Sequence, residues 1–577
     1  MKFNKAIYFV LLFCMAVSCT KILDKKDLTA VSEKDVWNDL SLATAYVERI
    51  YARNLPGWST EWADYSEESD GGGGYMYGQL TENSVNYWPY DDIREINVLL
   101  ANIDKGTLKQ SDKNVLKGEA FFFRAWQYFE MAKRYGGVPL ILHPQDRSED
   151  LFVKRNSTSE TFKQIIKDLD SAIAGLPTFT ATSGDNDGHV HKGTALAVKG
   201  RVLLFYASPQ FDPSQTTSRW QAAYDANKAA KDYLLSKGFG LYSDFEGLWY
   251  KEMNKEDIFV RRYEYSSLNS ASKSNWAAST RPLDISQGAT GGNRPTWEMV
   301  NKFPMKDGRA ITDPGSAYTY NPDYYWQNRD PRFKKTIVYN GAVWGVGANG
   351  AEPGRIQWTY IGGEQNNPTI TGFYMRKGVD TTQSSIDAFN SSTDWVELRF
   401  AEVLLNLAEA ANETGKTSEA YDELKTIRTR AGIDPGVYGM YGLKLNMSQN
   451  EMREAIRLER AIELAYEGKR FWDLRRWRAF ETKLNGTRRH GLNINLKISK
   501  GDWNHLRDSL SSQEMVSLLN RSYTNYFDDE IKVLDTQFDI NWKPEYYFFA
   551  IPNEHLQLNS NLEQTMGWAG GTFDPLK

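Results

Sequence analysis

Three glutamates at four-residue spacing are the clearest candidates for acid–base chemistry in this sequence. Glu459, Glu463 and Glu467 fall on one face of a predicted helix, because residues four apart lie one above the other. One interpretation makes two of them the general acid and base of a glycoside hydrolase. The alternative is a structural ion-pair network with three nearby arginines: Arg460, Arg470 and Arg475. The apolar neighbours of the glutamates favour the network, so no catalytic residue is predicted.

Other polar groups do not form a recognisable catalytic, metal or cofactor site. The run Asn328-Arg329-Asp330-Pro331-Arg332 is typical of a turn locked by Asp–Arg pairs. His189 and His191 are close together in a polar loop, but no further Cys or His lies near them, so they are expected to be exposed and not to bind metal. Asp185-x-Asp187 lacks the full calcium-loop pattern. Nucleophile-elbow, P-loop and dinucleotide motifs are missing, and no cofactor is predicted.

Aromatic residues are the groups best suited to binding. They make up 13% of the chain, with 18 Trp and 32 Tyr, and they are dense in two long Gly-rich segments, residues 54–90 and 266–363. Loops this long are usually functional. Aromatic rings stack on the C–H faces of sugars while polar side chains bond the hydroxyls. The predicted glycan-binding residues are Trp62, Asp64, Tyr65, Asp70, Tyr75, Tyr77, Tyr87, Trp88, Trp276, Arg281 and Trp344, with Asn83 as a further polar candidate.

The alternative interpretation is that about half of these aromatic residues only hold the loops in place and do not contact a ligand. Four further tryptophans lie on predicted helices and are expected in the core: Trp126, Trp395, Trp472 and Trp477.

Paired amphipathic helices must position these groups. Apolar residues recur at helical spacing over residues 394–413, and a second helix runs from about residue 417 to Gly432. The spacing of this pair is typical of a tetratricopeptide repeat. Further helices are predicted at residues 115–135, 161–176, 194–207, 220–235 and 449–466. The sequence therefore predicts a mainly α protein.

The N-terminus has the pattern of a targeting segment. Lys2 and Lys5 precede an apolar run at residues 6–17, which ends in Ala16-Val17-Ser18-Cys19. This predicts a lipoprotein signal peptide at residues 1–18, a lipidated Cys19 and a tether over residues 19–36; the alternative is an ordinary secretory signal. Cys14 and Cys19 are the only cysteines, so the body holds no disulfide.

Charge and hydropathy argue against two classes of partner, nucleic acid and a membrane that the chain would span. The net charge is -5 and no long basic run occurs, which argues against nucleic-acid binding. No later stretch is long and apolar enough for a transmembrane helix, so membrane contact is expected through the lipid alone.

Several motifs in a shared order resemble the SusD/RagB family of outer-membrane nutrient-binding lipoproteins. They are Phe123-Arg124-Ala125, Tyr135-Gly136-Gly137-Val138-Pro139, Pro295-Thr296, Asn328-Arg329-Asp330-Pro331-Arg332, Leu398-Arg399-Phe400-Ala401-Glu402, Ile427-Arg428-Thr429-Arg430-Ala431-Gly432, Glu467-Gly468-Lys469-Arg470 and Ile551-Pro552.

The resemblance implies about four tetratricopeptide-like helix pairs that support an irregular, loop-rich subdomain. It divides the body into residues 37–265 and 266–577, the latter with a loop-rich insert (266–393) and further repeats (394–480). It also implies an outward-facing lipoprotein that captures oligosaccharide or polysaccharide for a SusC-like TonB-dependent transporter. A peptide ligand, a glycoside hydrolase and a pure protein scaffold are the alternatives.

Overall fold

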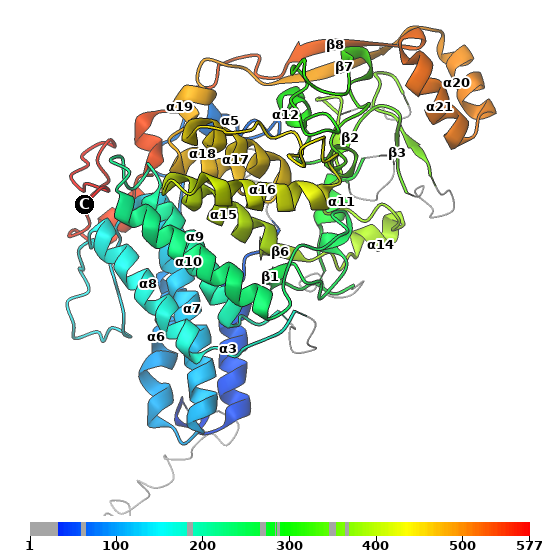
Figure 1. The fold of residues 1–577 in the computed structure, drawn as a ribbon. Coiled ribbons are helices and arrows are strands. Elements are labelled where there is room, and N and C mark those ends of the chain that lie inside the picture. Colours follow the sequence, from blue (N-terminus) through cyan, green and yellow to red (C-terminus); the bar gives the residue numbers. More distant parts are fainter. Residues whose placement is uncertain are drawn as a thin grey trace, which may run out of the picture.

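Helices form most of the regular structure (Figure 1). The structure is a computed structural model that describes residues 33–58, 65–181, 188–265, 273–282, 284, 289–345, 354–363 and 369–577. The longer helices are α3 (Leu40–Asn54), α6 (Tyr90–Asn102), α7 (Gln110–Tyr135), α8 (Thr158–Gly175), α9 (Lys192–Ala207), α10 (Thr217–Ser236), α15 (Phe400–Glu413), α16 (Thr417–Ala431), α17 (Gln449–Glu463), α20 (Lys500–Ser509) and α21 (Ser512–Ser522).

Short helices lie between them: α2 (Glu33–Val36), α5 (Gly73–Met76), α11 (Trp276–Thr280), α12 (Trp297–Lys302), α13 (Arg332–Thr336), α14 (Ser385–Phe389), α18 (Arg470–Arg476), α19 (Phe480–Lys483) and α22 (Asn553–Leu558).

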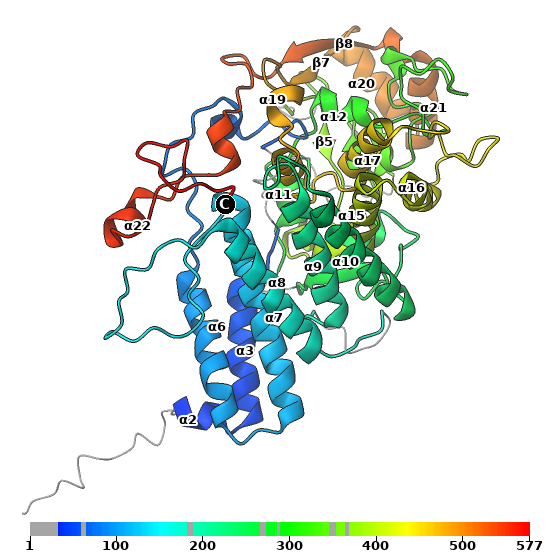
Figure 2. The ribbon, with the colours of Figure 1, turned by 60° about the vertical axis from the view of Figure 1, so that its left-hand side comes forward.

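The helices pack as the predicted pairs. α7 lies against α8, α9 against α10 and α15 against α16, while α17 packs on α15. In Figures 1 and 2 these pairs follow one another through the molecule, with α3 and α6 beside α7 at one end. The mainly helical fold expected from the sequence is confirmed, although α3, α20 and α21 were not predicted.

Helix α7 is central because almost its whole circumference is buried. Its buried residues include Phe122, Trp126 and Phe129, and also charged residues such as Glu130. A wide buried arc requires neighbours on several sides, and α3, α6, α8 and α9 supply them. The helix ends where Gly136 takes a positive φ of 75°, a conformation that glycine adopts without a Cβ penalty.

One predicted helix boundary was wrong. Residues 395–399 form strand β6 (Trp395–Arg399), and α15 begins only at Phe400. β6 pairs antiparallel with β1 (Asp257–Arg261), and all five of its residues are buried. A short, fully buried run shows no period that separates a strand from a helix, so the sequence could not place this boundary.

The described strands form four two-stranded antiparallel pairs. Besides β1–β6 they are β2 (Ile337–Val338) with β5 (Tyr374–Met375), β3 (Ala342–Val343) with β4 (Ile356–Gln357), and β7 (His490–Leu496) with β8 (Phe527–Val533). β7, β8, α20 and α21 lie together at the end of the molecule opposite α3 (Figure 1). β1 and β6 come from the two predicted parts of the body, so these two parts share a strand pair. The domain boundary near residue 265 stays a prediction.

A buried ion-pair network joins the helix pairs to the loop-rich part. Arg399, at the end of β6, contacts Glu463 at 2.7 Å, Glu467 at 2.7 Å and Glu256 at 2.6 Å. Arg332, at the start of α13, contacts Glu459 at 2.7 Å and Glu463 at 2.8 Å. These two arginines and the glutamates are almost completely shielded from solvent. The network therefore holds α17 against segments from distant parts of the sequence.

The prediction of a structural network was right, but its expected partners were wrong. Arg460 instead pairs with Asp473, Arg470 with Glu67, and Arg475 donates to the carbonyl of Tyr547. The true partners are Arg332, Arg399, Arg428, Arg430 and Lys377. All five are distant in sequence from the glutamates, so local spacing did not reveal them. α17 ends at Glu463, and Glu467 lies beyond it.

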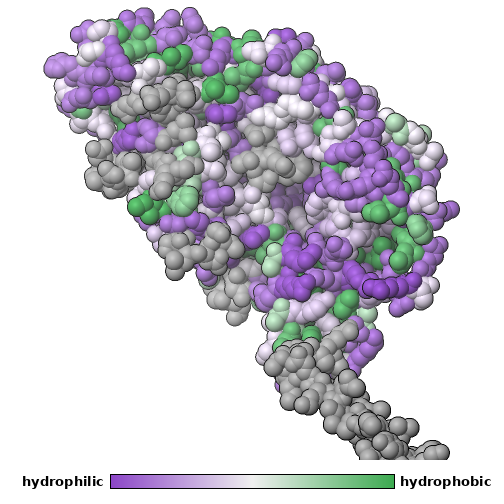
Figure 3. All heavy atoms as spheres, turned by 180° about the vertical axis from the view of Figure 1, so that it is seen from behind, coloured by the Kyte–Doolittle hydropathy of each residue, from purple (hydrophilic) through white to green (hydrophobic). Residues whose placement is uncertain are grey.

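The predicted turn at residues 328–332 is confirmed. The guanidinium of Arg332 contacts the carboxylate of Asp330 at 2.7 Å, and Asn328 has a positive φ of 54°. Among the described residues no helix is long and apolar enough to cross a membrane. On the face seen in Figure 3, hydrophilic and hydrophobic residues are interspersed over the described part of the surface.

Replacing Arg399 by Met should destabilise the fold strongly. The change leaves Glu463, Glu467 and Glu256 without one of their cations in a buried site, and breaking a buried ion pair typically costs about 3–5 kcal/mol. Urea unfolding followed by circular dichroism measures this loss. The matched control is Arg49→Met, at a side chain that is 63% exposed and paired with Glu95. Equal stability of the two variants would contradict the structural role of the network.

Candidate functional site

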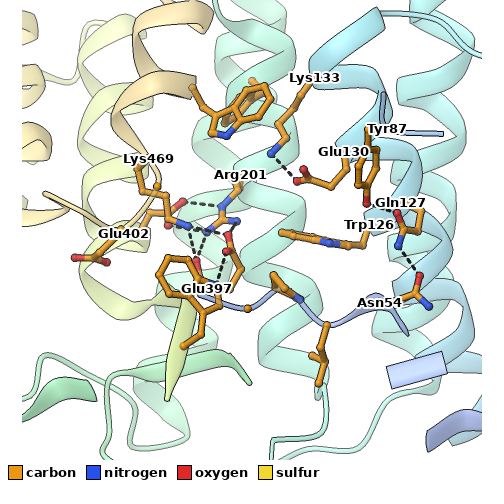
Figure 4. A pocket seen from close by; sticks show the side chains of 18 of the residues that line it. Asn54, Tyr87, Trp126, Gln127, Glu130, Lys133, Arg201, Glu397, Glu402 and Lys469 are labelled. Carbon is orange, nitrogen blue, oxygen red and sulfur yellow. Dashed lines mark hydrogen bonds and ion pairs between the residues drawn. The ribbon is translucent and has the colours of Figure 1, made fainter. Parts of the chain in front are cut away.

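A cavity of about 320 Å³ lies between α7, α9, β6–α15 and α18 (Figure 4). Residues 53–57, which end α3 and follow it, line one side of it. Among the described residues that line it, cations and carboxylates are equal in number. The cations are Arg53, Lys133, Arg201, Arg460 and Lys469. The carboxylates are Glu130, Glu397, Glu402, Glu467 and Asp473. We call this space the polar cavity.

Helix α7 supplies one wall of the polar cavity. Trp126, Glu130 and Lys133 are four and three residues apart, so they share a face of the helix. The Lys133 ammonium lies 2.5 Å from Glu130 and 4.3 Å from the ring centroid of Trp472. Burial lowers the pKa of Lys133 to about 8, although Glu130 raises it. Burial raises the pKa of Glu130, but Lys133 and Arg134 bring it down to about 2. Both groups are therefore charged at pH 7.

The opposite wall is built around Arg201 of α9. Its guanidinium makes contacts of 2.7 Å with Glu402 and 2.6 Å with Glu397, and it also donates to the Glu397 carbonyl at 2.8 Å. Lys469 contacts the Glu397 carboxylate at 2.7 Å. Burial raises the pKa of Glu402, but Arg201 and Lys469 lower it to about 2. The ions of this wall neutralise one another (Figure 4).

Aromatic rings and amides complete the lining. Trp126, Trp395 and Trp472 border the cavity, and each is no more than 6% exposed. The Tyr87 hydroxyl donates to Gln127, whose amide donates to Asn54. The cavity thus offers apolar ring surfaces together with fixed hydrogen-bonding groups, which is the combination found in small-molecule sites.

A cluster of four tryptophans adjoins the polar cavity. Trp58 stacks on Trp276 with ring centroids 4.3 Å apart, and Trp249 and Trp395 meet it edge-on at 6.1 and 4.8 Å. We call these four residues the tryptophan cluster. Trp395 belongs to both features, and Trp58 directly follows the segment that lines the cavity. The cluster and the cavity therefore form one continuous region.

The predicted site residues of the first long segment do not gather in one place. Trp62 and Asp64 lie outside the described residues. Tyr65 and Tyr75 stack on each other at 3.9 Å, and both meet Phe471 edge-on. Tyr87 lines the polar cavity.

The remaining candidates of this segment have partners elsewhere. Tyr77 donates to Asp535, Trp88 stacks on His555 with centroids 5.0 Å apart, and Asp70 pairs with Arg294. Asn83 accepts a hydrogen bond from the backbone of Asn553.

The three candidates of the second segment are buried. Trp276 is 1% exposed, and Arg281 and Trp344 are 0% exposed. Trp276 belongs to the tryptophan cluster, while the Arg281 guanidinium lies 5.4 Å from the ring of Trp344. Burial lowers the pKa of Arg281 to about 10. Contact of these side chains with a ligand stays a prediction.

Sequence reasoning missed the polar cavity. Trp126, Trp395 and Trp472 are buried as expected, but their assignment to the core overlooked that each borders this space. One available signal was the pair Glu130 and Lys133 within the wide apolar arc of α7. Charged groups are almost never fully buried without a partner, so such a pair indicates a polar interior.

The three glutamates are poorly placed for hydrolysis. Glu463 is 0% exposed. Burial raises its pKa, but Arg430, Arg399 and Arg332 hold the pKa well below its usual range. A general acid for glycoside cleavage needs a raised pKa and access to the bond, so Glu463 meets neither requirement.

The two histidines have structural roles. His189 contacts Glu119 at 2.9 Å and Glu48 at 3.1 Å. His191 is fully buried, contrary to the expected exposure, because its ring accepts from the Gly193 amide and caps α9. Burial lowers the pKa of His191 to about 4. No group of three or more potential metal ligands occurs among the described residues. Asp185 and Asp187 lie outside them.

Two family models match the chain. Residues 246–568 match the SusD family, and residues 16–204 match a family described as starch-binding and associating with the outer membrane. Among curated proteins, SusD-like protein P2 of Formosa agariphila is 24% identical over 403 residues, which cover 68% of this chain and 71% of the relative.

Solved structures share the fold. A SusD-like protein from Bacteroides fragilis superposes with a TM-score of 0.74 at 24% identity, covering 93% of this chain and 99% of that one. A SusD-like carbohydrate-binding protein from the same species gives 0.69 at 22% identity over 92% and 100%. A laminarin-binding SusD-like protein gives 0.56 at 21% identity over 92% and 100%.

Arginines pin the described part of the first long segment. Arg489 donates to the carbonyls of Ser69 at 2.7 Å and Gly71 at 2.6 Å, and Arg470 contacts Glu67 at 2.5 Å. The next residue, Glu68, is 1% exposed, and its carboxylate oxygens have no hydrogen-bond partner among the described residues. Burial and the neighbouring Glu67 raise the pKa of Glu68 to about 8.

Glu68 should make the stability of the protein fall as the pH rises. Its folded pKa of about 8 exceeds the ordinary value of 4.5. Between about pH 4.5 and pH 8 the Glu68 carboxyl is ionised in the unfolded state but still protonated in the folded state. The free energy of unfolding therefore falls over this range, compared with a variant that carries a neutral side chain at this position. We expect the Tm of Glu68→Gln, measured by differential scanning fluorimetry, to exceed that of the wild type by a margin that grows from pH 5 to pH 8.

The neighbouring residue provides the matched control. Burial raises the pKa of Glu67, but Arg470 and Lys302 hold it well below its usual range, so Glu67→Gln should lower the Tm at pH 7. A difference in Tm between Glu68→Gln and the wild type that does not change with pH would contradict the raised pKa of Glu68.

Proposed function

The chain belongs to the SusD family, and on that premise we propose that it is a cell-surface lipoprotein that captures a glycan. It then delivers the glycan to a SusC-like TonB-dependent transporter in the outer membrane. The family match covers residues 246–568, and the second match carries the description of outer-membrane association. The resemblance of the chain to this class of lipoproteins supports delivery to a transporter.

The observation that carries glycan binding is the continuous region of the tryptophan cluster and the polar cavity. Sugars present apolar C–H faces and many hydroxyls, and this region places tryptophan rings, with Trp58 partly exposed, beside fixed polar groups. The carbohydrate-binding and laminarin-binding relatives support the same ligand class.

The proposed ligand contacts extend from this region into the two long aromatic segments. Trp62, Asp64 and Tyr75 are the contacts we propose to test in the first segment, and Arg281 and Trp344 belong to the second. The protein is proposed to bind without catalysis, because the carboxylates best spaced for hydrolysis are buried and paired with arginines.

Anchoring is proposed through a lipid on Cys19. The sequence before it has a basic start, an apolar run and small residues at the cleavage position. Several acyl chains hold a protein on a membrane because each buried methylene contributes about 0.8 kcal/mol.

The body without residues 1–19 should bind an oligosaccharide or polysaccharide in an affinity-gel and glycan-array screen. Trp62→Ala and Tyr75→Ala should each weaken this binding by at least tenfold, because each removes a ring that stacks on sugar. Tyr438→Ala is the control, since Tyr438 is 77% exposed and lies outside both long segments. Tight binding of peptides with no binding of any glycan would contradict the proposed glycan function.

Cys19→Ala should release the full-length protein from the outer membrane, because the acceptor thiol is lost. Cell fractionation and metabolic labelling with a fatty-acid analogue measure this directly. Cys14→Ala removes the other cysteine and should leave the protein anchored and labelled. Anchoring that survives in Cys19→Ala would mean that the segment is an ordinary secretory signal.

A further inference from the structure

We propose that the polar cavity is the end subsite of this region and accepts one end of an uncharged saccharide. This rests on the proposed glycan function and goes beyond it, because the aromatic segments would bind a chain from the outside. The cavity would take its terminal sugar.

The size of the cavity suits a short ligand. Its volume of about 320 Å³ lies at the lower end of the roughly 300–1,000 Å³ range of small-molecule sites. At about 30 Å³ per water the same space holds on the order of ten waters. A sugar end that displaces part of this water meets polar groups that replace the lost hydrogen bonds.

The charge balance of the lining selects against ionic ligands. The five cations and five carboxylates among its described lining residues are paired within the protein, as the contacts of Arg201 with Glu397 and Glu402 illustrate. An acidic sugar would have to break such a pair or sit beside an unpaired carboxylate. Buried charges without partners are costly, so a hexuronate or a sulfated sugar is excluded more strongly than a neutral hexose.

Neutral sugars find both kinds of contact in the cavity. Lys133 has one carboxylate partner among the described residues, Glu130, so its ammonium keeps N–H donors for a hydroxyl. Trp126 and Trp472 add ring surface, and the Gln127 amide is a further polar group of the lining. Sugars carry hydroxyls that donate and accept as well as apolar C–H faces, so they use all of these groups at once.

One partly exposed stretch of the lining lies next to the tryptophan cluster along the chain. Leu55 and Gly57 line the cavity and are partly exposed, and Trp58 follows directly. Trp58 stacks on Trp276. A glycan chain that leaves the cavity past Leu55 would therefore reach Trp58, the one member of the tryptophan cluster that is partly exposed.

Filling the cavity from its lining tests the proposal. Leu55→Trp adds a large ring at a partly exposed lining residue, and Leu235→Trp makes the same change at a side chain of α10 that is 48% exposed. The probes are neutral mono- and disaccharides of glucose, galactose and mannose, glucuronate and galacturonate, and the longest glycan bound in the array. We expect at least one neutral short saccharide to bind the wild type and Leu235→Trp equally and Leu55→Trp at least tenfold more weakly in calorimetry. The uronates should not bind.

A second pair of variants covers the case in which Leu55→Trp fails to fold. Lys133→Met removes the cavity ammonium at similar length, and Lys113→Met removes a buried ammonium of the same helix that donates to the carbonyl of Gly106. Only Lys133→Met should weaken binding of the neutral saccharide.

The binding experiments distinguish a failure of the cavity proposal from a failure of the proposed function. Long-glycan binding with no short saccharide affected by either cavity variant would mean that the cavity holds water only, and the proposed function would stand. Uronate binding equal to that of the neutral sugars would overturn the charge argument. The absence of any saccharide binding by the wild type would overturn both proposals.

Discussion

The buried contacts of Arg399 determine how the rest of the molecule is arranged. This side chain lies at the end of β6, where the chain passes from the loop-rich part into α15. It meets carboxylates from before β1, from the end of α17 and from just beyond α17. Removing several charges from water is costly, and the geometry must be close to ideal to compensate. The network is therefore better explained as a device that fixes relative positions than as a source of large stability.

The same network reaches the proposed ligand region. Glu467 pairs with Arg399 and Lys377 and also lines the polar cavity. The backbone carbonyl of Lys377 accepts a hydrogen bond of 3.2 Å from the indole of Trp276, which carries the stack with Trp58. One set of ion pairs thus supports a wall of the cavity and the base of the tryptophan cluster. A preformed region of this kind lowers the cost of ordering side chains when a ligand binds.

The sequence predicted the helix pairs well and the ligand region poorly, for separate physical reasons. Helices such as α7 and α16 show a strong period and clear stops at Gly136 and Gly432, which depend only on nearby residues. The partners of Glu463 are 33 to 131 residues away, so no local pattern reveals them. β6 is a short buried run without a distinguishing period. Trp276 and Arg281 were identified by composition, but their burial depends on tertiary packing.

The central claim is that a neutral glycan occupies the region formed by the tryptophan cluster and the polar cavity. A crystal structure of the body with a bound oligosaccharide tests it most directly. The account predicts sugar density that runs from beside Trp58 into the cavity, with a terminal unit between Trp126 and Trp472. Sugar density confined to a surface that touches neither feature, with only ordered water in the cavity, would contradict it.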